Sequence, residues 1–437
     1  MSTKHLPAPP PFSPPPIPDD YNAGYFPSVP RDTRIRLKRH RTRTHTHEKT
    51  QAPEILLGAL PAGAEGATIV SFSPDGTLIA LACVADESSA REAPLYAIRI
   101  YCADTGREAC GALIAHSALI HSLDWNPESS ALLSAGADGV AVVWRIPRST
   151  PGSRAPLNSP PSLHAVLTPP LASYLYAATF HPGAPSAVIT ASYDGSLRLW
   201  DVALDDTSGG QMGLEAHLIG EISEAVPRHL AGTTRALRAY VNTLAWDTKA
   251  HTDGSTRRLL AGDSQGAIKV YQVASVTSNT TTASMPSQFD TSRYPLIDTL
   301  ILPAFEGIPI VSICVRASVA ALGATHALVL GQANILRIVD IDTHTQLRVL
   351  SGVHCSAVRA QAFFSPCGNL AAAGGDDGIL RVWNTESGAP VSVTIGGLPA
   401  GFPSLLVSLS WSPTSHSIAI AGFGAGYNAL LLGSLHV

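Results

Sequence analysis

Charged residues, long apolar runs and a signal segment are scarce or missing in this sequence, and each absence excludes a class of protein. Charged residues make up 14% of the 437 residues and hydrophobic residues 45%, so the chain has enough apolar surface for a core and is not wholly disordered. The best candidate for the run of about 18 apolar residues that a membrane helix needs is 315–331, which contains Arg316 and His326. The first residues, MSTKHLPAPPPF, lack the apolar stretch of a secretory signal, so we expect an intracellular protein.

Motifs for metal binding and catalysis are missing as well. The six cysteines are scattered and include no C-x-x-C pair, which favours buried free thiols in a reducing compartment over a zinc site or disulfides. They are Cys83, Cys102, Cys110, Cys314, Cys355 and Cys367. No P-loop, G-x-S-x-G or H-E-x-x-H motif occurs. We therefore expect no cofactor, no metal site, no small-molecule substrate and no enzymatic activity.

Residues 1–52 differ in composition from the rest of the chain. They hold nine Lys/Arg against four Asp/Glu, a net charge of +5, which leaves about −9 for residues 53–437. The segment Pro7–Pro18 reads PAPPPFSPPPIP and predicts polyproline II, as a spacer or as a ligand for an SH3 or WW domain. The basic run 31–49 would contact anionic lipid, an acidic surface such as the tubulin tail, or nucleic acid. We expect a disordered, Pro-rich and basic tail.

From residue 54 onward one phrase recurs seven times. It consists of an apolar strand, a turn, a second strand, a tight turn that is often Asp-Gly, and a third strand that ends in an aromatic residue. The clearest copies cover residues 115–146, 174–202 and 357–385. Three weaker copies have Tyr101, Tyr271 and Val339 where the clear copies have Trp. Seven copies that each form four strands predict an all-β, seven-bladed β-propeller.

The ends of the repeat region predict how the ring closes. The last copy ends at its third strand, 428–432, while EILLGAL, residues 54–60, precedes the first copy without a partner. We therefore expect one domain, residues 53–437, in which the strand 54–60 supplies the outer strand of the seventh blade.

One window contains the residue types of a Ser-His-Asp hydrolase, namely Ser134, His116 and Asp138. Related residues recur in other copies, however, whereas a catalytic triad occurs once. Repetition therefore favours a packing role over catalysis.

The Asp-Gly turns followed by strands ending in Trp-Asp or Trp-Asn resemble the WD40 repeat family. In that family a His, a Ser or Thr, an Asp and a Trp of one blade form a hydrogen-bonded tetrad. The resemblance implies structural tetrads at His116, Ser134, Asp138 and Trp144, at Thr190, Asp194 and Trp200, and at Asp377 and Trp383.

The differences between copies narrow the resemblance. The phrases FEGIPI (305–310), LRIVDI (336–341) and SPCG (365–368) resemble the jouberin family of ciliary transition-zone proteins, and the resemblance covers roughly residues 54–435. It implies a non-catalytic protein-interaction scaffold in cilium or flagellum assembly at the basal body and transition zone. It also implies other transition-zone proteins as partners, and a location at the ciliary base, in the cytoskeleton or in the cytoplasm.

A generic cytosolic WD40 adaptor is the alternative, for example a ubiquitin-ligase substrate receptor or a ribosome-assembly factor. The W-D-x-R signature of cullin-linked receptors is missing after Trp200 and Trp383. Animal jouberins also extend into coiled-coil sequence upstream and an SH3 domain downstream. No activity that depends on that SH3 domain is expected of these 437 residues.

Overall fold

The computed structural model describes residues 52–434, apart from 64, 86–95, 149–156, 171–172, 203, 205–215, 224–238, 248–255, 275–294, 317–323, 396–397, 404 and 425–426. The segment Pro7–Pro18 and the basic run 31–49 lie outside the described residues.

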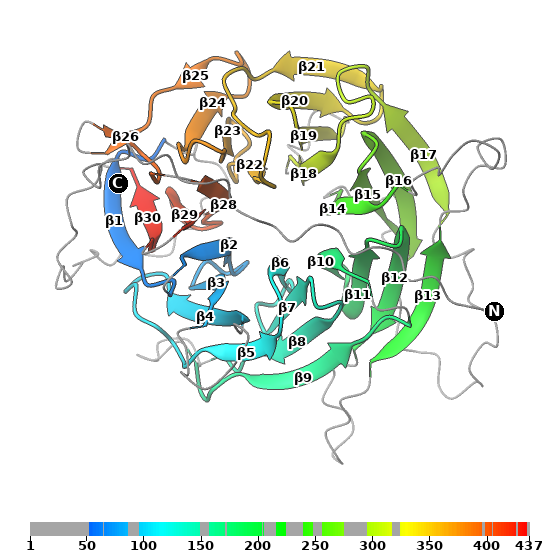
Figure 1. Cartoon of the computed structure of the whole chain (residues 1–437), viewed down its shortest axis with the longest axis vertical. Helices are drawn as coiled ribbons and strands as arrows, with labels where there is room; N and C mark the ends of the chain where they lie inside the picture. Colours follow the sequence, from blue (N-terminus) through cyan, green and yellow to red (C-terminus); the bar gives the residue numbers. More distant parts are fainter. Residues whose placement is uncertain are drawn as a thin grey trace.

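The described strands form seven four-stranded antiparallel sheets, which are arranged as blades of a ring (Figure 1). Blades one to four are β2 (Ala67–Phe72), β3 (Leu78–Val84), β4 (Tyr96–Cys102), β5 (Leu113–His116); β6 (Ile120–Trp125), β7 (Ala131–Gly136), β8 (Ala141–Arg145), β9 (Ser162–Leu167); β10 (Leu175–His181), β11 (Ala184–Ser192), β12 (Ser196–Asp201), β13 (His217–Ser223); and β14 (Val241–Trp246), β15 (Thr256–Asp263), β16 (Ala267–Ala274), β17 (Leu296–Ile301). Blades five to seven are β18 (Ile310–Val315), β19 (His326–Gly331), β20 (Ile335–Asp340), β21 (Thr345–Val349); β22 (Ala362–Phe364), β23 (Leu370–Ala373), β24 (Arg381–Asn384), β25 (Pro390–Val391); and β28 (Leu405–Trp411), β29 (Ser417–Phe423), β30 (Ala429–Gly433), β1 (Ile55–Leu60). A short pair, β26 (Thr394–Ile395) and β27 (Leu398–Pro399), lies between blades six and seven in the chain. The expected all-β, seven-bladed propeller is confirmed.

The seventh blade combines the two ends of the described chain. Strand β1 pairs antiparallel with β30, with Ile55 opposite Gly433 and Leu60 opposite Ala429. The amide of Glu54 extends the ladder by donating to the carbonyl of Gly433 at 2.7 Å. Figure 1 shows β1 on the outside of β30, at the position that the sequence assigns to residues 54–60.

The apolar cores lie between blades. Among the described residues, seven clusters of buried side chains combine neighbouring blades: six draw on two blades, and one draws on blades five, six and seven. One of them joins Leu78 and Ile98 of blade one to Trp125 and Leu132 of blade two. Since burial of apolar area contributes about 25 cal/mol per Å², each blade depends on both neighbours for its stability.

Hydroxyl groups connect the inner strands around the ring. The inner strands do not pair with each other, so their edge amides need other partners. At four of the seven steps between blades, a hydroxyl accepts from an amide of the next blade: Ser122 from Ala178 at 3.2 Å, Thr243 from Ile313 at 3.3 Å, Ser312 from Ala362 at 3.2 Å, and Ser408 from Val70 at 3.0 Å. The other three steps use Thr68 Oγ1 donating to Ile120 O, Trp246 Nε1 donating to Thr179 Oγ1, and Ser408 Oγ donating to Gln361 Oε1. We call these six Ser and Thr side chains the seam hydroxyls.

Deleting residues 54–60 should lower the melting temperature sharply, because it removes β1, exposes the edge of β30 and uncovers the cluster to which Leu60 belongs. Thermal unfolding followed by circular dichroism measures the effect. A chain that lacks residues 2–8 serves as a control of equal length. An unchanged melting curve after deletion of 54–60 would contradict closure by this strand.

Candidate functional site

Six inner strands carry a register break close to their first residue, and the residue at each break lines one cavity. The unmatched residues are Thr68, His121, Tyr176, Asn242, Val311 and Val407. A β-bulge re-aims a side chain, and here the bulges direct one residue per strand toward the ring axis. The cavity has a volume of about 240 Å³ and lies at the end of the ring where the inner strands begin. We call this end the channel mouth.

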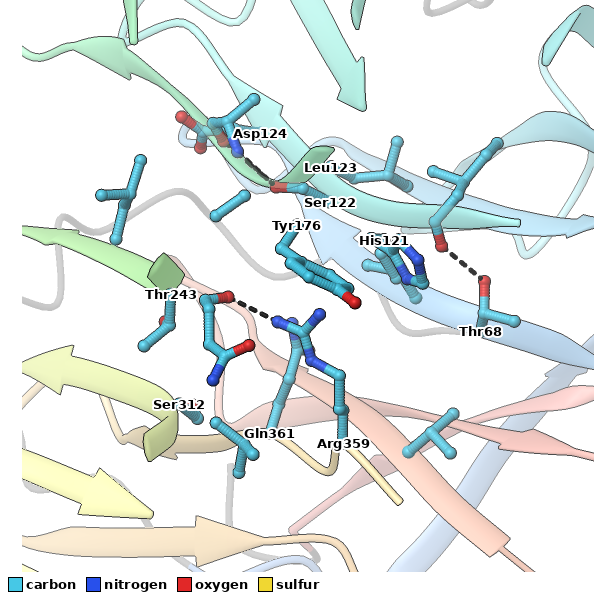
Figure 2. Close-up of a pocket in the computed structure, with 18 of the residues that line it drawn as sticks. Thr68, His121, Ser122, Leu123, Asp124, Tyr176, Thr243, Ser312, Arg359 and Gln361 are labelled. Carbon is cyan, nitrogen blue, oxygen red and sulfur yellow. Dashed lines mark hydrogen bonds between the residues drawn. The ribbon is translucent and has the colours of Figure 1, made fainter. Parts of the chain in front are cut away.

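Arg359, which precedes β22 in blade six, reaches across the channel mouth to the opposite side of the ring. Its guanidinium carbon lies 4.3 Å from the centroid of the Tyr176 ring in blade three. Its Nη2 donates to the carbonyl oxygen of Asn242 in blade four. Figure 2 shows the guanidinium beneath the Tyr176 ring, with His121 beside them. A cation over the face of an aromatic ring is attracted by about 0.5–2 kcal/mol, depending on desolvation.

Four tyrosines from blades three and four surround this contact, and we call them the tyrosine shelf. Tyr176 stacks on Tyr240 with ring centroids 5.3 Å apart, and Tyr193 lies 4.8 Å from Tyr240. Tyr174 packs edge-on against Tyr193 at 6.3 Å. All four are half-buried. The shelf therefore presents ring faces and phenol groups at the channel mouth.

The described residues that line the cavity include one cation, Arg359, and one carboxylate, Asp124. Burial lowers the pKa of the Arg359 guanidinium, which still lies far above neutral pH in proteins. Burial, helped by the charge of Arg359, lowers the pKa of His121 to about 3, so this imidazole is neutral at pH 7. Burial raises the pKa of Tyr176 to about 12, which keeps its hydroxyl protonated.

Three of the four residues of the first predicted tetrad lie together where β5 of blade one meets blade two. His116 Nδ1 lies 2.9 Å from Asp138 Oδ2, and His116 Nε2 lies 2.8 Å from Ser134 Oγ. Burial raises the pKa of Asp138, but the hydrogen bond and charge of His116 and the amides of Val140 and Ser117 outweigh it and hold that pKa below its ordinary value.

The fourth residue of that set, Trp144, corrects the expectation from sequence. Its Nε1 is buried and finds no hydrogen-bond partner among the described residues. The Ser134 hydroxyl instead lies within hydrogen-bond distance of His116 Nε2, at 2.8 Å, and of the Val142 carbonyl, at 3.4 Å. Trp144 contributes apolar packing in the cluster between blades one and two.

Blade three shows the tryptophan bond but uses arginine as its cation. Trp200 Nε1 donates to Thr190 Oγ1 at 2.9 Å. Asp194 accepts from Arg198 Nη2 at 2.7 Å, and Arg198 also donates to Ser192 Oγ at 2.8 Å. Thr190 and Trp200 thus bond each other, whereas Asp194 bonds Arg198. The predicted set therefore forms two separate hydrogen-bonded groups.

Blade six follows the same arrangement. Asp377 accepts from Arg381 Nη1 at 2.8 Å, and Trp383 Nε1 donates to the carbonyl of Ser351 at 3.0 Å. Burial raises the pKa of Asp377, and the hydrogen bonds and charge of Arg381 overcome this and lower it. The predicted Asp377 and Trp383 therefore each have a hydrogen-bond partner, but they do not belong to one tetrad. The second strand of this blade has Ala373 at the position where a tetrad would have a Ser or Thr hydroxyl.

Sequence reasoning missed the arginines and the residues of the channel mouth. The arginines could have been predicted from the sequence. Asp194 and Arg198 are four residues apart across a turn, in DGSLR, and Asp377 and Arg381 have the same spacing in DGILR. No sequence pattern indicates the channel mouth, because Arg359 and Tyr176 come into contact only when the ring closes.

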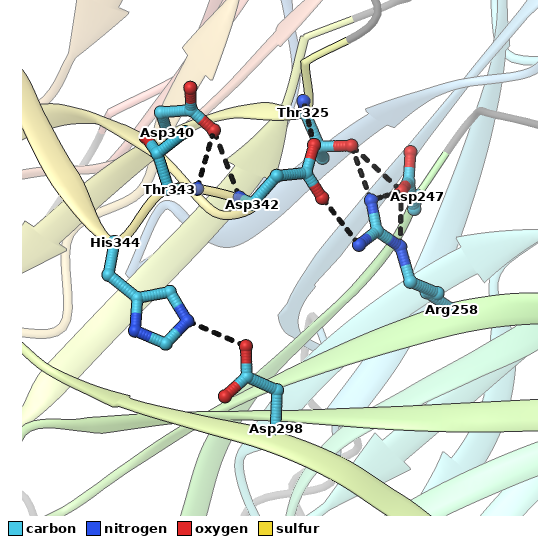
Figure 3. Close-up of polar contacts among 8 residues, drawn as sticks. All are labelled: Asp247, Arg258, Asp298, Thr325, Asp340, Asp342, Thr343 and His344. Carbon is cyan, nitrogen blue, oxygen red and sulfur yellow. Dashed lines mark hydrogen bonds and ion pairs between the residues drawn. The ribbon is translucent and has the colours of Figure 1, made fainter.

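A second polar cluster joins blades four and five at the other end of the ring (Figure 3). Arg258 Nε donates to Asp247 Oδ2 at 2.9 Å, and its Nη1 donates to Asp342 Oδ1 at 2.6 Å. The Thr325 hydroxyl also donates to Asp247, at 3.0 Å. Burial lowers the pKa of Arg258, but its two aspartate partners outweigh burial and raise it. This cluster is a satisfied link between two blades.

The described residues contain no group of three or more His, Cys, Asp or Glu side chains placed to hold a metal ion. In the same part of the chain, no helix has the length and hydropathy that crossing a membrane requires.

Three segments match the family model described as WD domain, G-beta repeat: residues 108–145, 165–201 and 344–384. They contain the three clearest copies of the repeat. The Cps50 (Swd1) β-propeller domain of Myceliophteria thermophila superposes with a TM-score of 0.57 and covers 87% of this chain and 100% of its own, at 18% identity. The fold is thus a seven-bladed β-propeller that contains WD40 repeats.

Similarity to curated proteins extends beyond single repeats. Jouberin of Rattus norvegicus and jouberin of Mus musculus are each 26% identical over 383 residues, which is 87% of this chain and 30% of the relative. Transducin beta-like protein 3 of Bos taurus is 25% identical over 215 residues, 46% of this chain and 23% of the relative. The chain is thus similar to jouberin over most of its length, and it spans about 30% of the length of the jouberins that it matches. Such a propeller indicates a protein-interaction role.

Asp138→Ala should lower the free energy of unfolding by about 1–3 kcal/mol, because it removes the acceptor of His116 and of two amides. Asp298→Ala is the control, since Asp298 forms an exposed ion pair with His344 that is worth at most about 1 kcal/mol. Urea unfolding followed by fluorescence measures both. Equal effects would contradict the structural role of Asp138.

Trp200→Phe and Trp144→Phe form a matched pair that tests the indole bonds. Both changes remove the same atoms, but only Trp200→Phe breaks a hydrogen bond and leaves the buried Thr190 hydroxyl without it. Trp200→Phe should therefore be the more destabilising by roughly 1–2 kcal/mol in urea unfolding. A larger loss for Trp144→Phe would show that its indole has a bonding role.

Proposed function

We propose that this chain is a non-catalytic scaffold that acts in the assembly of the cilium or flagellum, at the basal body and transition zone. One observation carries the proposal, namely the similarity to jouberin over 87% of the chain. Single WD40 repeats are shared by proteins of many functions, whereas a match of this length includes the atypical blades that end in Tyr101, Tyr271 and Val339.

The residues that resemble a catalytic triad support a scaffold rather than an enzyme. His116, Ser134 and Asp138 have distances that a Ser-His-Asp hydrolase would use. Yet Ser134 is 0% exposed and His116 is 1% exposed, so no substrate can reach the hydroxyl. The set acts as a buried polar contact that fixes the strands of blade two.

Partners are proposed in two groups. Other transition-zone proteins would bind the faces of the ring, and the tail would contact anionic lipid, tubulin or nucleic acid through 31–49, or an SH3 or WW domain through Pro7–Pro18. The generic cytosolic adaptor is less supported, because the similarity to transducin beta-like protein 3 covers 46% of the chain against 87% for jouberin.

Localisation of the tagged chain, expressed from its own locus, tests the function. We expect a focus at the ciliary base that coincides with a centriole marker. The chain without residues 54–60 is the control, because it should lose the focus if the intact ring is required. A diffuse or nucleolar signal for the full chain, or a source organism without cilia, would contradict the proposal.

A further inference from the structure

Arg359 differs from the other buried charges at the channel mouth because no carboxylate compensates it. On the same end of the ring, carboxylates in the blade turns pair with a basic residue: Asp194 with Arg198, Asp263 with Lys269 and Asp377 with Arg381 within one blade, and Asp138 with His116 at the end of β5 in the preceding blade. Among the described residues, Arg359 has no ion pair, and its Nη1 has no hydrogen-bond partner. A desolvated guanidinium without a counter-charge costs free energy, and the Tyr176 ring and one carbonyl offset only part of it.

The ionisable neighbours in the cavity do not supply that counter-charge. Asp124 also lines the cavity, and although burial raises its pKa to about 6, it is mostly ionised at pH 7; its partners are the Phe180 amide and the Thr179 hydroxyl, both at 2.8 Å, and not Arg359. His121 is neutral at pH 7, since burial and Arg359 lower its pKa to about 3. A negative group entering the channel mouth would therefore meet one uncompensated positive charge.

We propose that the channel mouth binds an Asp or Glu side chain from an extended acidic segment of a partner protein, with Arg359 as its ion-pair partner. This inference rests on the scaffold role proposed above. The cavity of about 240 Å³ has room for one such side chain and not for a folded domain. The tyrosine shelf beside it offers rings to the flanking residues, and Tyr and Arg are the residue types that dominate interface hot spots.

The composition of the channel mouth favours a carboxylate over a phosphate. One guanidinium matches the charge of one carboxylate and can bond it through two parallel N–H groups. Phosphopeptide sites instead use clusters of arginines, and Arg359 is the only Lys or Arg among the described residues that line this cavity.

Selection from a random dodecapeptide phage library on the purified full chain tests the proposal. The wild type should enrich peptides rich in Asp and Glu, and Arg359→Met should not. Arg348→Met is the charge-matched control, because Arg348 is exposed on the outer strand β21, and it should enrich the same peptides as the wild type. If the wild type does not enrich acidic peptides, or if Arg359→Met enriches them equally, the proposal is overturned.

Affinities of one selected peptide provide the second readout. By fluorescence anisotropy, exchange of its Glu residues for Gln, and separately Arg359→Met, should each weaken binding by at least about tenfold. Arg359→Lys should recover part of the loss, since it keeps the charge but not the paired N–H groups. Melting temperatures check that each variant is folded. If Arg359→Met is not, Tyr193→Ala removes one shelf ring and leaves Arg359 in place, and it should still weaken binding severalfold.

The two proposals fail in different ways. The peptide selection needs no cilium, so acidic enrichment by a protein that does not localise to the ciliary base would refute the ciliary role alone. Correct localisation of both the wild type and Arg359→Met, with no acidic enrichment, would refute the anion-binding role of the channel mouth alone.

Discussion

Burial between neighbouring blades is the constraint on which this structure depends. Each of the seven apolar clusters draws on at least two neighbouring blades, so a single blade would expose both of its faces to water. The last interface can form only when the chain returns to its start, and β1 brings Leu60 into the cluster between blades seven and one. Stability and ring closure are therefore the same requirement.

The register breaks near the channel combine structural and functional roles. In β6 the break lies between Ile120 and Ser122, so His121 turns toward the cavity while Ser122 bonds the backbone of Ala178 in the next blade. The same sequence of bulge residue and seam hydroxyl occurs in β14, β18 and β28. A substitution at the bulge residue thus changes the channel mouth and leaves the neighbouring hydroxyl, and with it the connection between blades, in place.

The sequence pattern of turns and strands made the fold predictable, but it did not predict the contacts of particular residues. The seven-bladed ring follows from the spacing of turns and strands, because these depend on near neighbours in the chain. The role of the Trp144 indole did not follow, since it depends on where the folded blade places Nε1 relative to an acceptor. The channel mouth is harder still, because Arg359 lies beside Tyr176 through the geometry of a closed ring and not through any motif.

The atypical blades show how the ring tolerates loss of its consensus residues. In blade one, Tyr101 replaces Trp, and its hydroxyl donates to the carbonyl of Pro61, next to the closing strand. In blade five, Val339 fills the apolar cluster without a polar handle, and the link from Arg258 to Asp342 ties this blade to blade four. The bond from Tyr101 to Pro61 and the bond from Arg258 to Asp342 each connect a blade to a neighbouring part of the ring. Because neighbouring blades stay in register by these contacts, blade six can hold Arg359 at a defined position against blades three and four.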